Sequence, residues 1–367
     1  MLQAQESFIY QSIILSVMSK IQTALLKGLV VFFIAAFAIS CSTRNVSIQL
    51  LVPAEITIPQ EISSIGVLNR SLPDKEQQLL NVLEGFVTGE SVLADREGSF
   101  NCIRGVEEKL RQSPRIRAVA IESDKYRGTG TRQFPELLDW RAVEDICRQY
   151  GVDAILALET FDSDFEIRKR TSRHKEKVNG REVTRTEHHA DLRVDVGSGW
   201  RLYDPIHRKI IDQVNFNDRK EWSGSGKTEQ EALDDLPSKR HSINESGRFA
   251  GVQLANRISP NWRTESRTFF VKGNDALKDA KTQVRYNNWD AAIVIWKKLA
   301  ESNDSEIAGK ACYNLALASE MKGNIDLAIV WAEKAMKNYH IRKARNYVAI
   351  LHARKSNEEI LREQMKE

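Results

Sequence analysis

Cys41 is the residue of this chain whose chemistry the surrounding sequence defines most sharply. It follows an apolar run, residues 28–39, which itself follows Lys20 and Lys27, and it precedes the polar stretch 42–45. A positive flank, a short apolar core and small residues before one cysteine are the layout of a bacterial lipoprotein signal, which is cut directly before the cysteine. We therefore expect the mature chain to begin at Cys41, with its sulfur carrying a fatty acyl anchor.

The length of the apolar run favours cleavage over a membrane-spanning helix. A spanning helix needs about 20 apolar residues, whereas a secretory core has about 7 to 15. Ala38 and Ser40 supply the small residues that the peptidase pocket requires, and the positive flank lies at the beginning of the signal if translation starts at Met18. The alternative is an uncleaved membrane helix that reaches back through Leu25 and Leu26.

An acylated Cys41 would be a durable membrane anchor. Each buried methylene contributes about 0.8 kcal/mol, so one acyl chain holds marginally and two or three hold stably. The residues that follow, Ser42-Thr43-Arg44, place no aspartate next to the cysteine. By analogy, we expect a location in the cell envelope, at the periplasmic face of the outer membrane.

A candidate phosphate-binding loop lies at 223–228, Ser-Gly-Ser-Gly-Lys-Thr, between a predicted strand and a predicted helix. A true loop has the form G-x-x-x-x-G-K-[ST], which needs a glycine where this chain has Glu221. Thr228 and Glu231 have instead the spacing of a capping box, and Glu229 would occupy the helix end that a phosphate needs. We expect a helix start here and no bound cofactor.

A candidate metal site consists of Glu187, His189 and Asp191, which alternate along a predicted strand and so point to one side. No H-E-x-x-H motif accompanies them, and the same hairpin offers the carboxylates three arginine partners, Arg181, Arg185 and Arg193. We therefore expect cross-strand charge pairing and no metal. No serine, cysteine or carboxylate pair has a recognisable catalytic setting, so we expect no enzyme.

The charge balance predicts no nucleic-acid partner. The formal net charge of +4 falls to +3 when residues 1–40 are removed. The basic stretch 168–177 suggests binding of nucleic acid or anionic lipid, but Glu166, Glu176 and Glu182 interrupt its charge. A solvated hairpin is the simpler expectation.

Composition places the mature chain among ordinary soluble proteins. The full sequence contains 41% hydrophobic and 28% charged residues, and its length without residues 1–40 suggests two domains. Cys102, Cys147 and Cys312 each share a helical face with apolar residues, and no C-x-x-C motif occurs. We expect all three to be small core residues.

The first domain should be a mixed sheet covered by helices, because helical and extended patterns alternate along it. A purely β segment follows at 165–216, where Asn179-Gly180 predicts the tight turn of a long hairpin. A helix at 230–258, interrupted near Pro237, closes the domain. Before the hairpin, we expect an extended linker and edge strand at 45–59, strands at 65–68, 116–121 and 154–161, and helices at 79–86, 103–110 and 137–150.

The sequence after Ser259-Pro260 is almost wholly helical and contains an internal repeat. A tetratricopeptide unit is two packed helices of about 34 residues, with small residues where the helices approach most closely. Ala280 and Ala292 take these positions in one unit, and Ala316 and Ala328 recur 36 residues later in the next. The alternative is a pair of unrelated amphipathic hairpins. The remaining members of the pattern are Trp289, Trp296, Leu315, Gly323, Ile325 and Ala335, with a third, degenerate pair at 342–355 and 358–365.

Stacked helix pairs form a concave surface, whose usual ligands are extended peptides. The first helices would present Lys281, Lys310, Tyr313 and Glu320 toward this groove. The alternative is that the same side chains form a solvated helix face. The repeats therefore predict a protein or peptide partner.

The order of these elements resembles that of a family of Bacteroidota lipoproteins of unknown function, which join an α/β domain to tetratricopeptide repeats. The α/β part also looks like the N-terminal domains of the Tol-system propeller protein and the curli-secretion lipoprotein, both envelope components. The resemblance implies a fold and a location but no activity. The resembling stretches are 65–70, 150–162, 200–212 and 257–270.

Together these features predict an α+β or α/β N-terminal domain with a long β-hairpin, followed by an all-α domain of tetratricopeptide-like repeats. We expect a lipid-anchored module that binds or scaffolds proteins, and the alternative is an enzyme whose α/β domain binds a nucleotide or metal. The expected segments are a signal at 1–40, a lipidated tether at 41–47, the α/β domain at 48–259 and the repeats at 260–367.

Overall fold

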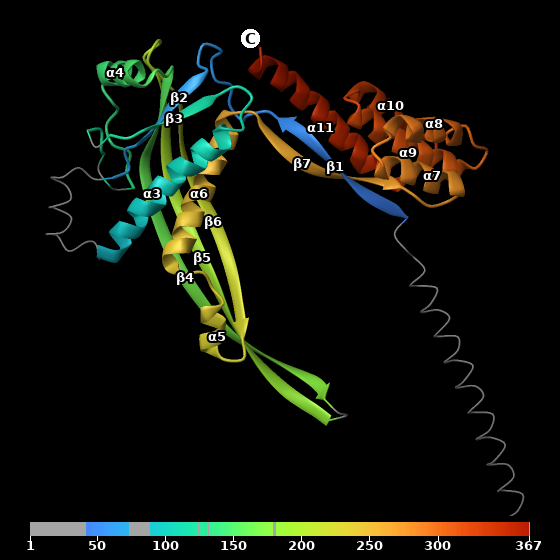
Figure 1. Ribbon diagram of the computed structural model, residues 1–367, viewed down its shortest axis with the longest axis horizontal. Coiled ribbons are helices and arrows are strands. Elements are labelled where there is room, and N and C mark those ends of the chain that lie inside the picture. Colours follow the sequence, from blue (N-terminus) through green and yellow to red (C-terminus); the bar gives the residue numbers. More distant parts are fainter. Residues whose placement is uncertain are drawn as a thin grey trace, which may run out of the picture. The chain divides into compact units, whose positions relative to one another are not determined.

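The computed structural model resolves the chain into two compact units (Figure 1). Residues 49–263 and 356–366 form the sheet unit, and residues 42–48 and 264–355 form the helical unit. Cys41 and the predicted helix at 79–86 lie outside the described residues. No helix within the described part of the chain is long and apolar enough to cross a membrane. The structure describes residues 42–72, 89–123, 125–128, 130, 132–178 and 181–366.

The sheet unit contains a five-stranded mixed sheet, as the sequence predicts, in the order β3-β2-β4-β5-β6. β2 is parallel to β3 and β4, whereas β4, β5 and β6 form an antiparallel meander. Val178 pairs with Arg181, so the strands flank the predicted Asn-Gly turn. β4 joins the predicted strand at 154–161 and the first arm of the predicted hairpin into one continuous strand. The strands are β2 (Ser64–Asn69), β3 (Arg117–Ile121), β4 (Ala154–Val178), β5 (Arg181–Asp204) and β6 (Lys209–Gly226).

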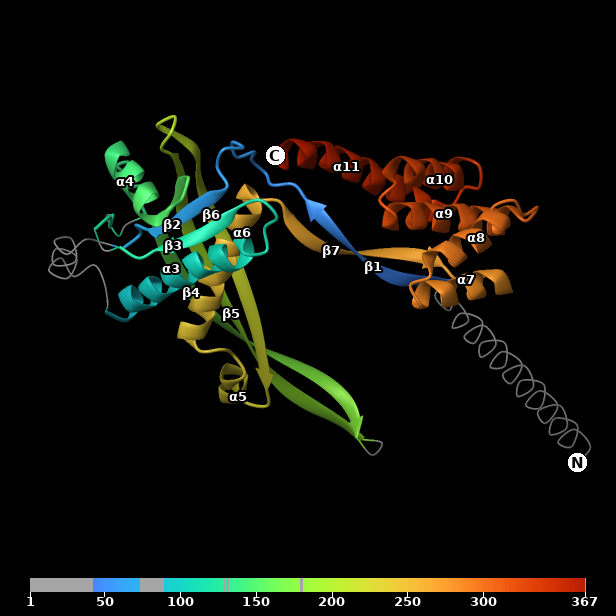
Figure 2. The same cartoon turned by 45° about the horizontal axis from the view of Figure 1, so that its top comes forward.

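Helices cover the two faces of this sheet unequally (Figure 2). α3 (Gly89–Leu110) and α6 (Lys239–Ile258) pack on one face over a core that includes Leu156, Val194 and Trp200. α4 (Trp140–Tyr150) packs on the other face, against a smaller core around Ile155 and Tyr203. The alternation of Ile155 and Leu156 between the two cores follows from the two-residue period of a strand.

The helix ends follow local sequence signals. α4 begins at Trp140, later than the predicted 137, because the Asp139 side chain accepts the Arg141 N–H as an N-cap. It ends at Gly151, which adopts a left-handed φ of 61°. The predicted interruption near Pro237 is confirmed, since α5 (Glu229–Asp234) and α6 are separate helices.

The three cysteines within the described residues are free and buried, as predicted. Cys102 and Cys147 lie in the sheet unit and Cys312 in the helical unit. Burial raises the pKa of Cys147 to about 12, and it also raises the pKa of the other two thiols. These cysteines therefore stay protonated at neutral pH and pack as small apolar side chains.

Two strands correct the sequence analysis. β1 (Thr43–Val52) and β7 (Asn261–Phe270) pair into a separate two-stranded sheet, so the strand expected within 45–59 begins earlier, at Thr43, and the chain after Pro260 begins with a strand and not with a helix. Val271 donates its N–H to the Ser42 carbonyl at 3.0 Å. The sequence pattern did not predict β7, because one of its buried positions is occupied by a charged residue, Arg267, where an apolar one is expected.

The helical unit contains consecutive packed helices, as predicted. Ala280, Ala292, Ala316 and Ala328 are all fully buried, and Gly323 has a φ of 77° in the turn before the fourth helix. The predicted third pair is wrong, because 342–364 is one continuous helix. The helices are α7 (Asp275–Arg285), α8 (Trp289–Leu299), α9 (Ser305–Met321), α10 (Ile325–Lys337) and α11 (Arg342–Gln364).

Candidate functional site

The end of strand β7 binds to the face of α9 that the repeat pattern assigns to the groove. Asn314 of α9 is fully buried and contacts the backbone of Phe270 with both ends of its amide. The Phe270 N–H donates to Asn314 Oδ1 at 2.7 Å, and Asn314 Nδ2 donates to the Phe270 carbonyl at 2.8 Å. One side chain thus satisfies both backbone groups of one strand residue.

Aromatic contacts fix the same strand segment. Phe270 packs edge-on against Tyr313, with ring centroids 5.2 Å apart, and Phe269 packs edge-on against Trp296 at 6.2 Å. These geometries are the ones that aromatic quadrupoles favour. Phe269, Phe270 and the following Val271 all belong to the core of the helical unit.

A buried charge cluster completes this contact. Glu320 of α9 is almost inaccessible and accepts hydrogen bonds from Arg267 of β7 at 3.1 Å and from the Tyr347 hydroxyl at 2.6 Å. Arg354 lies 2.9 Å from the same carboxylate. Burial and the Glu320 charge raise the pKa of Tyr347, so its hydroxyl remains a donor. Two guanidinium groups and one hydroxyl therefore compensate the buried carboxylate.

These contacts correct the predicted groove. Tyr313 and Glu320 face neither an empty groove nor solvent, because β7 of the same chain covers them. Lys281 and Lys310 stay partly accessible, and Lys310 pairs with Glu306 at 2.6 Å. A partner peptide cannot use the part of the groove that β7 fills.

The outer sides of α8 and α10 carry exposed apolar side chains. Val294 of α8 is 69% exposed and Val330 of α10 is 59% exposed, and Leu327 of α10 is also exposed. Val294 and Val330 are 36 residues apart, which is the interval between the matching alanines. The two helix pairs thus expose the same apolar position. We call these three residues the outer apolar face.

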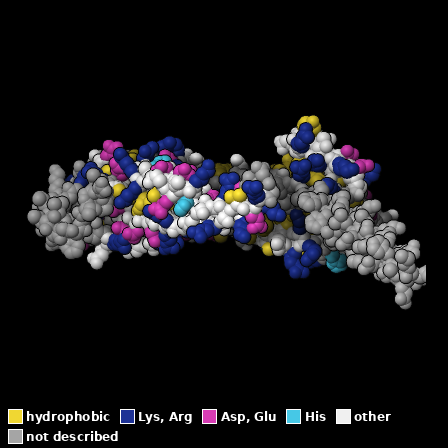
Figure 3. Space-filling model, turned by 90° about the horizontal axis from the view of Figure 1, so that it is seen from below, with side chains coloured by type: hydrophobic (Ala, Val, Ile, Leu, Met, Phe, Trp, Pro, Cys, Tyr) yellow, Lys and Arg dark blue, Asp and Glu magenta, His cyan; other side chains and the backbone are white. Residues whose placement is uncertain are grey.

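Other views of the surface show a mixture of charges. On the face in Figure 3, lysine and arginine side chains are interspersed with aspartate and glutamate among the described atoms. Hydrophobic side chains appear there only in small, separate groups.

The sheet unit holds a second buried charge cluster, beyond the carboxyl end of β2. Arg70 Nη1 lies 2.7 Å from a Glu159 oxygen, and the Tyr203 hydroxyl donates to Glu159 at 2.6 Å. Arg201 Nη1 lies 3.7 Å from the same carboxylate. Burial raises the pKa of Glu159, although both arginines oppose this shift.

Such a position at the end of parallel strands is where open α/β sheets often bind ligands. Here the backbone carbonyls of Tyr126, Pro135 and Glu136 already take up the donors. Arg70 donates to the carbonyls of Tyr126 and Glu136, and Arg201 donates to the Pro135 carbonyl. The cluster therefore binds these three backbone positions to the sheet.

The candidate phosphate loop is a helix start, as predicted. The Thr228 hydroxyl accepts the Glu231 N–H at 3.1 Å. The Glu231 carboxylate accepts the Lys227 N–H at 2.7 Å, one residue earlier than a standard capping box requires. Glu229 pairs with Lys169 at 2.7 Å. The backbone donors near the helix start thus already have carboxylate and hydroxyl partners.

The candidate metal residues have partners across the sheet. Asp191 accepts hydrogen bonds from Arg170 at 3.0 Å and Ser223 at 2.8 Å, and His189 contacts Ser172 at 2.8 Å. The predicted cross-strand charge pairing is therefore confirmed for Asp191, whereas Glu187 lies 3.9 Å from His189 of the same strand. Within the described ranges, no group of three or more His, Cys, Asp or Glu residues could hold a metal ion.

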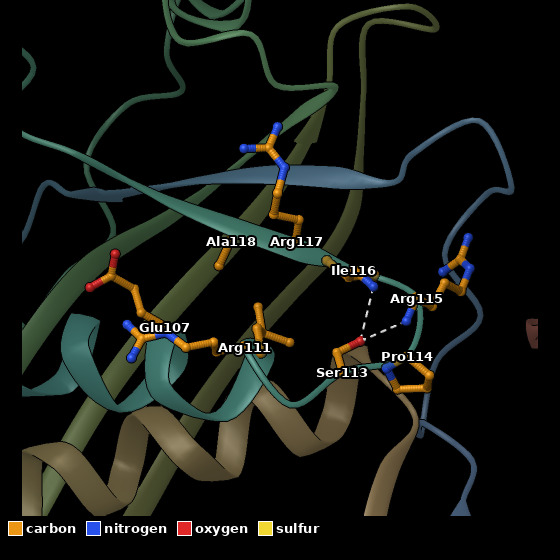
Figure 4. Close-up of a pocket in the computed structure, with 9 residues that line it drawn as sticks. Glu107, Arg111, Ser113, Pro114, Arg115, Ile116, Arg117 and Ala118 are labelled. Carbon is orange, nitrogen blue, oxygen red and sulfur yellow. Dashed lines mark hydrogen bonds between the residues drawn. The ribbon is translucent and has the colours of Figure 1, made fainter.

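A pocket of about 290 Å³ lies between the end of α3 and the start of β3 (Figure 4). Its arginines point in different directions. Arg115 donates to the carbonyls of Ile58 and Pro59 at 2.8 and 2.7 Å, and Arg117 donates to the Gly151 carbonyl at 3.3 Å. The pocket therefore lacks polar groups that converge on one point, as a specific site requires.

Two family models match the chain. Residues 62–270 match a model described as a domain of unknown function, DUF8603. Residues 278–353 match a second domain of unknown function, DUF6340. The first match spans most of the sheet unit together with β7, and the second spans α7 to α10 and part of α11.

No curated protein matches the chain. One similar solved structure is a Helicobacter pylori protein described as a neuraminyllactose-binding hemagglutinin homolog, with 13% sequence identity and a TM-score of 0.23. The match covers 56% of this chain and 91% of that one. A similarity of this size supports no conclusion about this chain.

Proposed function

We propose that this chain, which belongs to the DUF8603 family, is an envelope lipoprotein that is anchored through Cys41 and binds other proteins through its helical unit. The proposal includes the resemblance to Bacteroidota lipoproteins with tetratricopeptide repeats and a location at the periplasmic face of the outer membrane. No catalytic step and no cofactor enter it.

The support for the anchor is the layout of the sequence around Cys41. β1 begins at Thr43, and the Ser42 carbonyl already accepts the Val271 N–H. Because a chain spans at most about 3.6 Å per residue, only a few ångströms separate Cys41 from the first strand. An acylated Cys41 would therefore hold the start of the helical unit close to the bilayer.

The observation that carries the binding function is the outer apolar face. Val294 and Val330 recur at matched positions of the two helix pairs and are both more than half exposed, and exposed apolar patches commonly mark interaction sites. Since β7 fills the predicted groove, the partner we propose binds Val294, Leu327 and Val330. This assignment moves the predicted protein partner from the inner to the outer side of the repeats.

In-cell photocrosslinking tests this proposal. A photoreactive amino acid placed at Val294 or Val330 should give the same discrete adduct with one envelope protein. Lys278 on α7, which is equally exposed but lies outside the outer apolar face, is the matched control position. Adducts of equal yield from Lys278, or none from either valine, would rule out the outer apolar face as the binding surface.

A further inference from the structure

The β4–β5 hairpin extends beyond the rest of the sheet as a two-stranded arm (Figures 1 and 2). β6 pairs with β5 only as far as His188, whereas β4 and β5 stay paired to Val178 and Arg181. At about 3.3 Å per residue, the arm beyond β6 is about 25 Å long. We define the arm as residues 171–178 and 181–188.

The register sorts the charges of the arm onto two different faces. Arg173, Lys175 and Lys177 alternate along β4 and share one face, where their paired residues on β5 are Thr186, Thr184 and Glu182. All three cations are exposed, and Lys175 contacts the single acid, Glu182, at 3.3 Å. We call Arg173, Lys175 and Lys177 the basic face.

On the opposite face of the arm, which we call the balanced face, positive side chains are paired with negative ones. Arg185 pairs there with Glu176, and Arg170 pairs with Asp191 at 3.0 Å near the base of the arm. The sequence analysis therefore predicted neutralisation correctly for this face alone. Of the glutamates that interrupt the basic stretch in sequence, Glu176 lies on this opposite face, and Glu182 is the one that lies on the basic face.

The outer edge of β4 in the arm is unpaired. β2 pairs only with residues 154–158 of β4, and β5 occupies the other edge. Among the described strands, none lies on this edge beyond Thr160. Lysines beside a free edge discourage pairing with neutral or basic strands, but they favour an acidic one.

We propose that this edge binds an extended acidic segment of a partner protein, which adds to β4 as a further strand. Alternate residues of a strand are about 7 Å apart and point to one side. A segment with carboxylates at alternate positions would therefore place them on the basic face, while its backbone pairs with β4. This mode of recognition takes affinity from main-chain hydrogen bonds and specificity from alternate side chains.

This site is separate from the outer apolar face, so each proposal can fail without the other. Binding of a labelled peptide to the full-length chain, followed by fluorescence anisotropy, tests the arm. The probe is a peptide of about ten residues with alternating glutamate and threonine, which is long enough to pair along the arm. The control has the same composition, with its glutamates in one block. We expect the alternating peptide to bind at least about fivefold more tightly, and equal binding would overturn the proposal.

Matched substitutions locate the site. Arg173→Glu reverses a charge on the basic face and Arg181→Glu reverses one on the balanced face, and both arginines oppose uncharged residues, Thr186 and Val178. We expect Arg173→Glu to weaken peptide binding about threefold to tenfold and Arg181→Glu to change it by less than about twofold. An equal effect of both substitutions would contradict the assignment to the basic face.

Backbone methylation distinguishes strand addition from simple charge attraction. N-methyl groups on the glutamates or on the threonines block alternate N–H donors of the peptide, and only one set faces β4. One methylated peptide should lose at least about tenfold in affinity while the other stays within about twofold. Strand addition is wrong if neither methylation lowers the affinity of the peptide. It is also wrong if inorganic polyphosphate binds as tightly as the peptide and depends on Arg173, because the arm would then be a general surface for polyanions.

Discussion

The Asn314 side chain replaces the hydrogen bonds that a neighbouring strand would make to Phe270. Its amide oxygen accepts the Phe270 N–H, and its amide nitrogen donates to the Phe270 carbonyl. Nothing in the sequence around Asn314 indicates this role, since a buried asparagine in a helix looks like any polar residue. Glu320 was similarly assigned to a groove or to solvent, whereas Arg267, Tyr347 and Arg354 surround it. Partners this distant in sequence can be found only in the folded chain.

Replacement of Asn314 by alanine should destabilise the helical unit. It would leave the buried N–H and carbonyl of Phe270 without partners, at a cost of about 1 to 3 kcal/mol each. Chemical denaturation should show a loss of about 2 to 4 kcal/mol in the free energy of unfolding. Asn303→Ala is the control, because Asn303 is exposed, and it should change stability by less than about 0.5 kcal/mol. Similar losses for both variants would contradict the role of Asn314.

Asp218 in β6 should make stability depend on pH. Its Oδ2 is buried without a hydrogen-bond partner among the described residues, and burial raises the pKa of Asp218 to about 6. In the unfolded chain the pKa is about 3.9, so folding disfavours the ionised form. The resulting penalty is absent below about pH 4, develops as the pH rises, and is complete above about pH 6.

The variant Asp218→Asn removes this titration with little change in volume. Because Asp218 is only partly buried, we expect the variant to gain about 1 kcal/mol relative to the parent at pH 7 and to lose that advantage at pH 4. Denaturation curves at the two pH values measure the difference. A stability difference that does not change with pH would show that Asp218 is ionised equally easily in both states.

At the scale of elements, sequence patterns located those segments that bury one face. The amphipathic helices, the Asn-Gly turn and the break at Pro237 are found because their periods and turn residues are local signals. The continuity of β4 was missed, since the polar run Asp162-Ser163-Asp164 is typical of a connection and separates the predicted strand at 154–161 from the predicted hairpin arm that begins at 165. The continuous α11 was predicted as two helices, although the sequence near residue 356 contains no glycine or proline.

The crossing of α3 and α6 depends on glycine. A Cβ atom built at Gly251 would lie 1.9 Å from the Cys102 carbonyl oxygen, which is backbone and cannot move aside cheaply. Gly251→Ala should therefore force the helices apart and destabilise the sheet unit by about 1 to 3 kcal/mol. Gly197→Ala is the control, because its nearest neighbour would be 3.7 Å away. If both variants lower the melting temperature equally, the close approach at Gly251 does not determine how the two helices cross.

At the scale of the whole molecule, the account joins an anchor to two binding surfaces. The anchor is proposed from the sequence before Thr43, the outer apolar face from the repeat interval, and the basic face from the register of a hairpin. The repeat interval was visible in the sequence, but which side of the repeats stays free was not. That outcome depends on β7, whose burial against α9 only the folded structure shows.

Mass spectrometry of the N-terminus of mature protein from its host tests the central claim most directly. The account predicts that the first residue is Cys41, with diacylglycerol on its sulfur and a further acyl group on its amine. In a Cys41→Ala variant, the unprocessed precursor should accumulate without acyl mass. A mature chain that begins upstream of Cys41, or a Cys41 peptide with no acyl group, would contradict the account.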